Sequence, residues 1–356
     1  VDFLYNTFDK FKNSLKLITF NKRDSHQSHS IISSDNKFLD IMDSNKKTMK
    51  AAIIDQVNGK LIVKEIPIPE PKEGQVLVKM IAAPINPSDI MVIGGIRSVP
   101  LPTQLGGEGY GIVVKAGDSK GEALIGKKVS FYAFNPNVWA EYGIVGLYEL
   151  MENNLDITPE QGATTYLNAV TTLGLVDNVK KGNHKAVIIT TAGVCSRMLL
   201  RLFKEEGIKT ISVVRKDEQK KVCLDNGATY ALNSTDADFE DQLKKLAAEI
   251  NATACIECVM GDLLGKIMRN MPRRSEIIWY GKLSDNDPNI KINAIDWLLQ
   301  ETSILGYVFG YWITSLTEDE RQKVFENIRK RLNDVFKTAI SKTSSWKNLM
   351  RLMTTT

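Results

Sequence analysis

The residues with the clearest potential for chemistry are those that could hold a nucleotide. Residues 190–197 read Thr-Thr-Ala-Gly-Val-Cys-Ser-Arg, at the end of the apolar run 186–191. A dinucleotide-binding turn needs glycines for its tight bend, for close approach of the pyrophosphate and for packing of the helix on the strand. Only Gly193 meets this need, so the G-x-G-x-x-G fingerprint is absent. The turn alone therefore does not establish a nucleotide site.

Arg215 could select between the two nicotinamide dinucleotides. It follows a second apolar run, Thr210–Val214, where an Asp or Glu would bind the adenine-ribose hydroxyls. An arginine there attracts the 2′-phosphate of NADPH through charge-assisted hydrogen bonds. The position therefore favours NADPH over NADH, and the alternative is a solvated loop arginine.

Cysteine and histidine are too scarce for metal or histidine-based chemistry. The chain has four Cys and three His, and only His184 lies outside the polar N-terminal stretch. Cys255 and Cys258 form one C-x-x-C, but they lie in the apolar stretch 252–259, which is typical of a strand. Residues three apart on a strand point to opposite faces. We expect no metal site, no disulfide framework and a reducing compartment.

The elements that must position these residues alternate between helix and strand after about Thr158. Apolar runs predict strands at 186–191, 210–214, 230–232, 252–259 and 276–280. Helices are predicted at 158–176, 196–206, 218–226, 238–250 and 262–271. This alternation is typical of a doubly wound parallel sheet, which binds ligands at the carboxyl ends of its strands.

The region before this alternation is predicted to be all β. From Met49 onward, short alternating segments are broken by Gly and Pro, which is typical of a partly open barrel. A length of 356 residues agrees with two domains. We expect an N-terminal extension at 1–48, a β domain at 49–165 that is completed by 307–356, and a nucleotide-binding domain at 166–306.

Length and charge exclude two further classes of protein. No apolar run approaches the roughly 20 residues that a helix needs to span a bilayer, so we expect no membrane span. The net charge of +4 is too small to indicate nucleic-acid binding. Residues 317–356 hold nine basic and five acidic side chains, so this segment alone accounts for the positive excess.

Both ends of the chain carry amphipathic patterns. Phe8, Phe11, Leu15 and Ile18 recur at helical spacing and predict an N-terminal helix, followed by a polar linker. This arm is either a flexible tail or a helix that docks on a partner. Near the other end, apolar residues between Val324 and Phe336 predict a helix that packs on the body of the protein, and only secondarily a partner surface.

Several short motifs connect residues 49 to about 345 with a known family. The most specific are the Asn86-Pro87-Ser88-Asp89 box and the Leu167-Asn168-x-x-Thr171 box. Others are Met49-Lys50-Ala51-Ala52, Gly106-Gly107-Glu108-Gly109-Tyr110-Gly111, Trp139-Ala140-Glu141-Tyr142, Val214-Arg215-Lys216-Asp217-Glu218, Asn226-Gly227-Ala228 and Tyr280-Gly281-Lys282-Leu283-Ser284. On these motifs the chain resembles a zinc-free medium-chain dehydrogenase/reductase, close to quinone oxidoreductases and mitochondrial-type 2-enoyl thioester reductases. Gly107-Glu108 lacks the His that supplies a metal ligand in the zinc-dependent branch.

This resemblance implies an α/β fold, with a GroES-like, partly open β-barrel domain and a Rossmann domain with a doubly wound parallel sheet. It also implies hydride transfer from NADPH to an activated double bond of a small-molecule substrate. The cofactor contacts that it implies are Asn168, Ala192, Gly193, Val194, Arg215, Tyr280, and the segment from Phe309 to Trp312. The Leu-Asn-x-x-Thr box favours an enoyl reductase.

The chain departs from the family pattern at three places. The family's catalytic Tyr is replaced by Arg97, which can stabilise an enolate by charge but has too high a pKa to donate a proton. Tyr110 is a substitute candidate, or else a packed aromatic. Cys195 stands where the phosphate turn has a glycine, and we expect its side chain to crowd the helix and the pyrophosphate. The family's closing strand, which rejoins the β domain, is expected to be missing.

Two functions remain open at this point. The first is an active NADPH-dependent enoyl thioester or quinone reductase. The second is a catalytically silent accessory subunit of a larger assembly, held through the N-terminal arm and the basic C-terminal segment. A homodimer is a further expectation. The resemblance favours a mitochondrial location, with the cytoplasm as the alternative because residues 1–48 have one Arg and six Asp.

Overall fold

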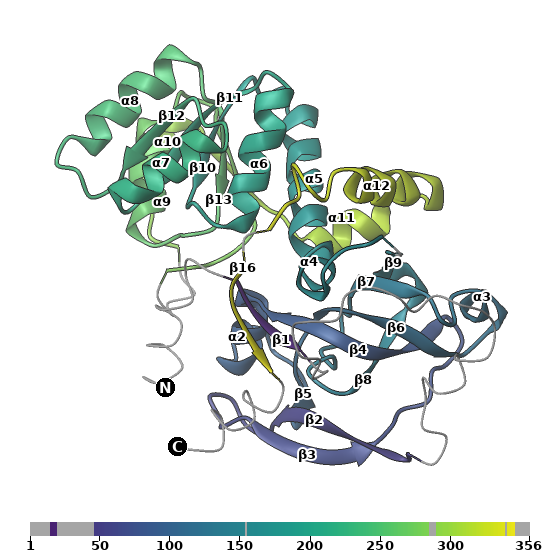
Figure 1. Ribbon diagram of the computed structural model, residues 1–356. Helices are drawn as coiled ribbons and strands as arrows, with labels where there is room; N and C mark the ends of the chain where they lie inside the picture. Colours follow the sequence, from purple (N-terminus) through teal and green to yellow (C-terminus); the bar gives the residue numbers. More distant parts are fainter. Residues whose placement is uncertain (1–14, 20–45, 154, 285–289, 339, 346–356) are drawn as a thin grey trace. The chain divides into compact units, whose positions relative to one another are not determined.

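The computed structural model describes residues 15–19, 46–153, 155–284, 290–338 and 340–345, and the chain divides into two compact units. Unit 1 comprises Val1–Leu167 and Thr338–Thr356, and unit 2 comprises Asn168–Lys337. Unit 1 contains two sheets and unit 2 contains one (Figure 1). None of the described helices is both long and apolar enough to cross a membrane.

Unit 1 is mainly β, as the sequence predicts. Its larger sheet has the order β16-β1-β4-β6-β7-β9, with β8 also paired to β4. These strands are Ile340–Ser345 (β16), Leu15–Thr19 (β1), Gln75–Ile85 (β4), Glu108–Ala116 (β6), Lys128–Tyr132 (β7), Leu150–Glu152 (β9) and Tyr142–Gly146 (β8). A smaller sheet joins Ile62–Pro67 (β3), Thr48–Ile54 (β2) and Thr103–Gln104 (β5). Short helices lie at Pro87–Ile93 (α2), Ser119–Glu122 (α3) and Pro159–Ala163 (α4), with a 3-10 turn at Leu147–Glu149 (η2).

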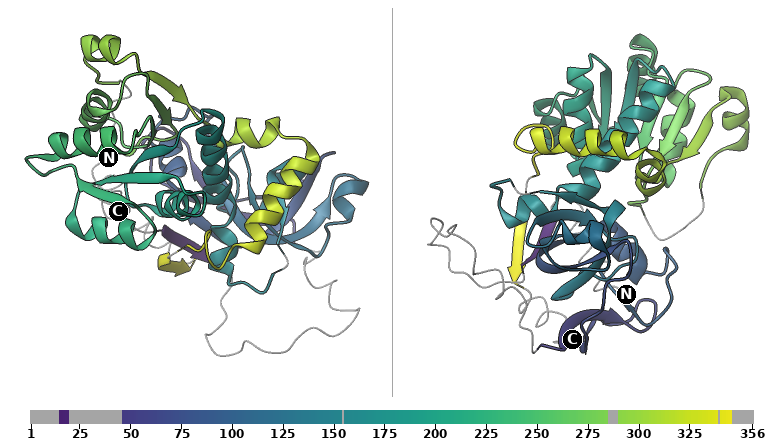
Figure 2. Two further views of the ribbon diagram at one scale, coloured as in Figure 1. Left: turned by 90° about the horizontal axis from the view of Figure 1, so that it is seen from above. Right: turned by 90° about the vertical axis from the view of Figure 1, so that its right-hand side faces the viewer.

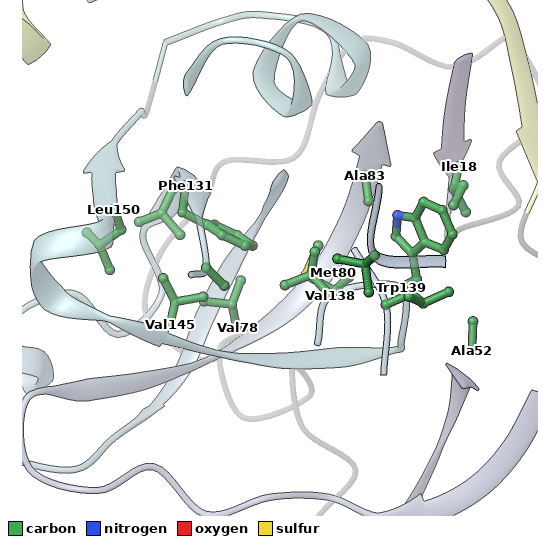
Figure 3. Close-up of a cluster of buried hydrophobic side chains, with 14 of the residues drawn as sticks. Ile18, Ala52, Val78, Met80, Ala83, Phe131, Val138, Trp139, Val145 and Leu150 are labelled. Atoms are coloured by element: carbon green, nitrogen blue, oxygen red, sulfur yellow. The ribbon is translucent and has the colours of Figure 1, made fainter. Parts of the chain in front are cut away.

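The core of unit 1 forms where the apolar faces of these strands meet (Figure 3). β4 is rich in β-branched and other apolar residues, and its Val76, Val78 and Met80 are all buried. Trp139 is 1% exposed and its indole N–H donates to the Pro84 carbonyl over 3.1 Å. The core therefore fixes the path of β4 up to the point where the Asn86–Asp89 box begins.

The N-terminal arm contributes a strand to this sheet, which corrects the predicted helix at residues 15–18. β1 runs antiparallel to β4, with Ile18 opposite Ala83, and parallel to β16. Leu17 and Ile18 are 1% and 0% exposed, and Ile18 belongs to the same core cluster as Trp139 (Figure 3). Pairing with the edge of β4 buries the adjacent residues Leu17 and Ile18, which point to opposite faces of the strand. An amphipathic helix would bury only one face, so this burial overrides the local helical spacing. Phe8 and Phe11 lie outside the described residues.

The C-terminal segment also rejoins unit 1, so the expected loss of the closing strand is wrong. β16 pairs with β1 along its whole length, from Leu15 opposite Ile340 to Thr19 opposite Ser345. In Figure 1 it is the yellow strand beside the purple β1. No sequence motif indicates this strand, because β16 is polar in sequence and its partner, β1, comes from the N-terminal arm.

Unit 2 is a parallel sheet of six strands in the order β12-β11-β10-β13-β14-β15. The strands are Tyr230–Asn233 (β12), Lys209–Val214 (β11), Ala186–Thr190 (β10), Ala254–Glu257 (β13), Glu276–Trp279 (β14) and Ser303–Gly306 (β15). Helices lie on both of its faces (Figures 1 and 2). They are Tyr166–Lys181 (α5, which begins in unit 1), Val194–Glu205 (α6), Asp217–Asp225 (α7), Phe239–Glu249 (α8), Asp262–Asn270 (α9) and Ala294–Gln300 (α10). The predicted doubly wound sheet is confirmed.

Residues 307–337 belong to unit 2, which corrects the prediction that they complete the β domain. They form Phe309–Ser315 (α11) and Glu318–Lys330 (α12). Phe325 and Ile328 of α12 are buried, as the predicted packing helix requires. Arg201 of α6 donates to the carbonyl oxygens of Asp334, Val335 and Lys337 over 2.8–3.2 Å. These bonds hold the end of this segment against the nucleotide-binding fold.

Candidate functional site

The phosphate turn between β10 and α6 is built with hydroxyl groups in place of most glycines. Thr191 has φ +71°, in the left-handed region that glycine adopts without strain. Its hydroxyl lies 2.8 Å from the Ser196 hydroxyl, which itself donates to the Thr190 carbonyl over 3.0 Å. The Gly193 N–H donates to the Thr191 hydroxyl over 3.4 Å. These bonds hold the bend that a glycine-rich sequence would form by its backbone freedom.

Gly193 leaves the turn open to a ligand. A Cβ added there would meet only the Thr191 hydroxyl, at 3.6 Å. The residue is the N-cap of α6, whose first N–H groups have no partners within the helix. Free N–H groups and the positive end of the helix dipole favour a phosphate at such a position. The backbone of Ala192, Gly193 and Val194 therefore fits the pyrophosphate of a dinucleotide.

Cys195 lies inside unit 2 and not on the open side of the turn. The residue is 9% exposed, and its Sγ lies 3.3 Å from the Thr172 hydroxyl of α5. Burial raises the pKa of its thiol to about 11. Its side chain thus fills the contact between α5 and α6, where the family glycine would allow closer packing. Of the two expected contacts of the Cys195 side chain, with the helix and with the pyrophosphate, the structure shows the one with the helix.

Arg215 stands at the carboxyl end of β11, directly after Val214, and is exposed. Its backbone N–H donates to the Gln219 side chain over 3.2 Å. The nearby Asp217 is neutralised by an ion pair with Lys220, at 2.9 Å. The charge at this strand end is therefore positive, which suits a 2′-phosphate and not a pair of ribose hydroxyls.

Of the other predicted cofactor residues in unit 2, Asn168 lies in α5 and Trp312 is bonded to it. Asn168 lies in its first half and accepts a hydrogen bond from Thr172 at its carbonyl, over 2.6 Å. The Tyr280 side chain turns inward, because its hydroxyl faces the thiols of Cys195 and Cys258, and burial raises its pKa well above the usual value. Trp312 donates its indole N–H to Asp177 over 2.9 Å. Phe309 begins α11, the helix that carries Trp312.

In unit 1 the loop after α2 carries Arg97, whose guanidinium group makes two hydrogen bonds. Its Nη1 donates to the Tyr132 hydroxyl over 3.2 Å and its Nη2 to the Phe134 carbonyl over 2.7 Å. Tyr132 could not be predicted as a partner of Arg97, because the two residues are far apart along the chain and leave no local signal. The sequence predicts a strand that ends at Tyr132, and in the structure this strand pairs with β6, where Tyr132 lies opposite Glu108.

Two buried carboxylates lie beneath this loop. Asp89 accepts from the backbone N–H groups of Asn86 and Gly107, over 2.7 and 3.2 Å. Glu108 accepts from the Asn86 side-chain amide over 2.8 Å and from the Leu167 N–H over 2.7 Å. Burial raises the pKa of Asp89 to about 7 and that of Glu108 to about 8. The Asn-Pro-Ser-Asp box thus caps the start of α2, next to two buried carboxyl groups that titrate near neutral pH.

Tyr110, the other catalytic candidate, is a packed core aromatic. It is 2% exposed, its ring covers Gly162, and its hydroxyl donates to the Asn153 carbonyl at 3.5 Å. Burial raises its pKa to about 12. Tyr110 therefore cannot reach a ligand in this conformation, and Arg97 is the remaining candidate.

Cys255 and Cys258 are both buried and free. Cys255 lies in β13 and Cys258 directly after it. Across the described part of the chain, no three His, Cys, Asp or Glu side chains are grouped so that they could hold a metal ion.

Comparison with known proteins gives the same two-part division. Residues 72–152 match the family model of the alcohol dehydrogenase GroES-like domain, and residues 196–330 match that of the zinc-binding dehydrogenase. A mitochondrial enoyl-acyl-carrier-protein reductase from Xenopus tropicalis is 26% identical over 77% of this chain and 79% of its own. Quinone oxidoreductase from Homo sapiens is 27% identical over 79% of this chain and 85% of its own.

Solved structures establish the fold. Escherichia coli quinone oxidoreductase, crystallised with NADPH, has a TM-score of 0.72 at 19% identity and covers 82% of this chain and 90% of its own. A mycobacterial quinone oxidoreductase has a TM-score of 0.71 at 19% identity, with 86% and 95% covered. The predicted pairing of a GroES-like domain with a Rossmann domain is confirmed. The chain belongs to the medium-chain dehydrogenase/reductase family, in the zinc-free branch of the enoyl reductases and quinone oxidoreductases.

Proposed function

We propose that the protein is an NADPH-dependent reductase that acts on an activated carbon–carbon double bond, as in an enoyl thioester or a quinone. The observation that carries the proposal is the combination in unit 2 of an open phosphate turn at Gly193 with Arg215 at the end of the next strand. Doubly wound sheets bind 2′-phosphorylated dinucleotides with these two elements. The reductase relatives support the reaction class.

The residues of unit 2 fit NADPH in three ways. The N–H groups of the first turn of α6 would bind the pyrophosphate, and Arg215 would bind the 2′-phosphate through charge-assisted hydrogen bonds. Asn168 and the backbone at Tyr280 remain our candidates for the nicotinamide half. When bound, NADPH supplies the hydride. The inward side chains of Tyr280 and Cys195 contact each other next to the phosphate turn and support it.

An enoyl thioester is the favoured substrate class and a quinone the second. The Leu167-Asn168-x-x-Thr171 box supports the first, and both activities occur among the relatives. We also propose a mitochondrial location, because several of the enoyl reductase relatives are mitochondrial proteins. The accessory-subunit alternative finds no support in the comparisons.

The direct test is the affinity of the protein for NADPH and for NADH, measured by calorimetric titration. We expect a micromolar dissociation constant for NADPH and about 10- to 100-fold weaker binding of NADH, as one charge-assisted contact implies. Arg215→Ala should weaken NADPH binding by a similar factor and leave NADH binding unchanged. NADPH oxidation is then followed with crotonyl-coenzyme A and with 1,4-benzoquinone.

Lys244→Ala is the matched control, since it removes a positive charge from an exposed position on α8. It should not change either affinity. Absence of NADPH binding at millimolar cofactor would contradict the proposal. Isolation of the native protein only within a large complex, without cofactor affinity, would instead favour the accessory subunit.

A further inference from the structure

We propose that Arg197 is a second cationic contact for the 2′-phosphate of NADPH, so that this residue and Arg215 together make unit 2 selective for NADPH. The inference rests on the proposed function and adds to it a residue that no sequence motif indicates. Arg197 is half-buried in α6 beside the phosphate turn. Among the described residues, none balances its charge.

The position of Arg197 on α6 brings its side chain toward the phosphate turn. Its backbone N–H donates to the Gly193 carbonyl over 3.0 Å, so residue 197 lies one helical turn after the N-cap. The Cα–Cβ bonds of a helix are tilted toward its N-terminus, and a long side chain there covers the preceding turn. Arg197 is therefore directed toward the backbone N–H groups that fit the pyrophosphate.

Arg197 also lies on the side of α6 that faces α7 and the end of β11. Its charge interacts with Cys223 of α7, whose Sγ lies 4.0 Å from the Thr191 carbonyl. The Thr191 N–H in turn donates to the Val213 carbonyl over 2.9 Å, two residues before Arg215. These contacts connect the surroundings of Arg197 with the strand end that carries Arg215. Both arginines thus border the same corner of the sheet.

The charge of Arg197 has no counter-charge in the described part of the chain. None of the described residues forms an ion pair or a hydrogen bond with its guanidinium group. Asp217, close to Arg215 in the chain, is already bonded to Lys220 at 2.9 Å and to Asn233 at 3.4 Å. Burial lowers the pKa of Arg197 from its usual value of 12.5, yet an arginine stays charged at neutral pH. A bound anion would offset the cost of holding this charge half-buried.

Arg201, one turn further along α6, shows what a structural arginine does on this side of the helix. Its Nε donates to the Asn226 side chain over 2.8 Å, and its Nη1 donates to three backbone carbonyls near the end of unit 2. These partners are neutral, so they leave its charge in place, and it repels that of Arg197. Packing therefore explains Arg201, whereas Arg197 gains a partner only from a ligand.

A phosphate monoester matches this corner better than any neutral group. The 2′-phosphate of NADPH carries a charge of about −1.5 to −2 at neutral pH and has three acceptor oxygens, which is enough for two arginines. Guanidinium groups bind phosphate oxygens through charge-assisted and often bidentate hydrogen bonds. The ribose hydroxyls of NADH offer no such charge. Arg197 and Arg215 would then act together on one phosphate group.

The test measures binding of NADPH, NADH and adenosine 2′,5′-bisphosphate to the full chain by calorimetric titration. The bisphosphate has the 2′-phosphate but no nicotinamide, so it reports on this corner of unit 2 alone. Arg197→Met should weaken binding of NADPH and of the bisphosphate about 10-fold, the effect of one charge-assisted hydrogen bond, and leave NADH binding unchanged. Arg197→Lys keeps the charge and should lose less affinity. Arg197→Met combined with Arg215→Ala should bind NADPH no more tightly than NADH.

Stability provides a second readout that separates ligand binding from support of the fold. Arg197→Met removes a half-buried charge without a counter-charge, so it should move the guanidinium unfolding midpoint of the cofactor-free protein to higher denaturant concentration. Arg201→Met is the matched control, because it makes the same change one turn along α6. It should lower the midpoint and leave the ratio of NADPH to NADH affinity unchanged.

Two results would overturn this inference and leave the proposed function in place. One is an NADPH affinity that Arg197→Met does not change. The other is an equal loss of NADPH and NADH affinity, which would mean that Arg197 acts on the shared part of the cofactor or on the fold. Failure of the wild type to bind either NADPH or the bisphosphate would instead remove the proposed function.

Discussion

The Asn86 side-chain amide donates a 2.8 Å hydrogen bond to the Glu108 carboxylate in the interior of unit 1. Asn86 belongs to the loop that starts α2, and Glu108 begins β6, so this bond ties the start of the Arg97 loop to the sheet. Glu108 is 1% exposed, and its burial raises its pKa to about 8. The loop that carries Arg97 is thus connected to a carboxyl group that titrates near neutral pH.

Stability should fall as this group ionises. The folded-state pKa of Glu108 lies above the ordinary value of 4.5, so its contribution is fully present below pH 4.5 and is lost as pH rises through about 8. Glu108→Gln should therefore flatten the pH dependence, and its advantage over the wild type should grow by roughly 2–4 kcal/mol between pH 5 and pH 9. Guanidinium unfolding at these two pH values measures the difference.

Glu122→Gln provides the comparison, because Glu122 is exposed on α3. It should leave the pH dependence as in the wild type. Equal slopes for Glu108→Gln and the wild type would mean that Glu108 stays ionised in the folded protein throughout this range.

Cys195 should matter more for stability than for cofactor affinity. Its sulfur lies against Thr172 of α5, and the residue is buried. Cys195→Gly removes buried atoms and places a glycine in the first turn of a helix, which should cost about 1–3 kcal/mol of unfolding free energy. The dissociation constant for NADPH should change less than about threefold, a limit that calorimetric titration checks.

Cys195→Ala, which keeps the Cβ, should lie between the wild type and the glycine variant in stability. A tenfold gain in NADPH affinity for Cys195→Gly would mean that the thiol obstructs the phosphate turn after all.

β1 should be essential to the β unit although it comes from the N-terminal arm. Ile18 is completely buried, and β1 is the partner through which β16 joins the sheet. Ile18→Ala should lower the unfolding free energy by about 2–4 kcal/mol, as for other large-to-small core changes. Deletion of residues 1–19 should abolish hydrogen-exchange protection in residues 340–345.

Thr19→Ala, at a half-buried position of the same strand, is the matched substitution and should have a small effect. Full protection of residues 340–345 after the deletion would contradict this account and would mean that β16 can pair with β4 directly.

The free edge of the unit 2 sheet should bind a second copy of the chain. Among the described strands β15 pairs only with β14, and Leu305 on it is 44% exposed. Leu298 and Leu299 of α10 are 70% and 65% exposed, and Tyr311 of α11 is 78% exposed. Exposed edges and apolar patches of this kind mark interfaces. Sedimentation at micromolar concentration should give a dimer.

Leu305→Lys combined with Leu298→Glu should yield a monomer by placing charges on this surface. Leu224→Glu, at an exposed position on α7, should leave the dimer intact. A wild-type monomer at tens of micromolar would contradict the predicted homodimer.

Much of the fold follows from local patterns. Apolar runs such as residues 186–190 and 210–214 are buried on both sides of a parallel sheet, and their composition alone predicts this. Arg215 and Gly193 could be singled out in the same way, because the roles that we propose for them depend on being next to a strand end. The helical spacing around Leu15 was misleading, because pairing with β4 determines the conformation of that segment.

The sequence by itself determined the two-part architecture, the family and the positive charge after β11, because these depend on residues that are neighbours in the chain. Only the tertiary structure decided that Cys195 faces Thr172, that Tyr110 is sealed in the core, and that Tyr132 holds Arg97. Each of these contacts joins segments that are distant in sequence. Their geometry is set by sheet register and core packing, which no local pattern encodes.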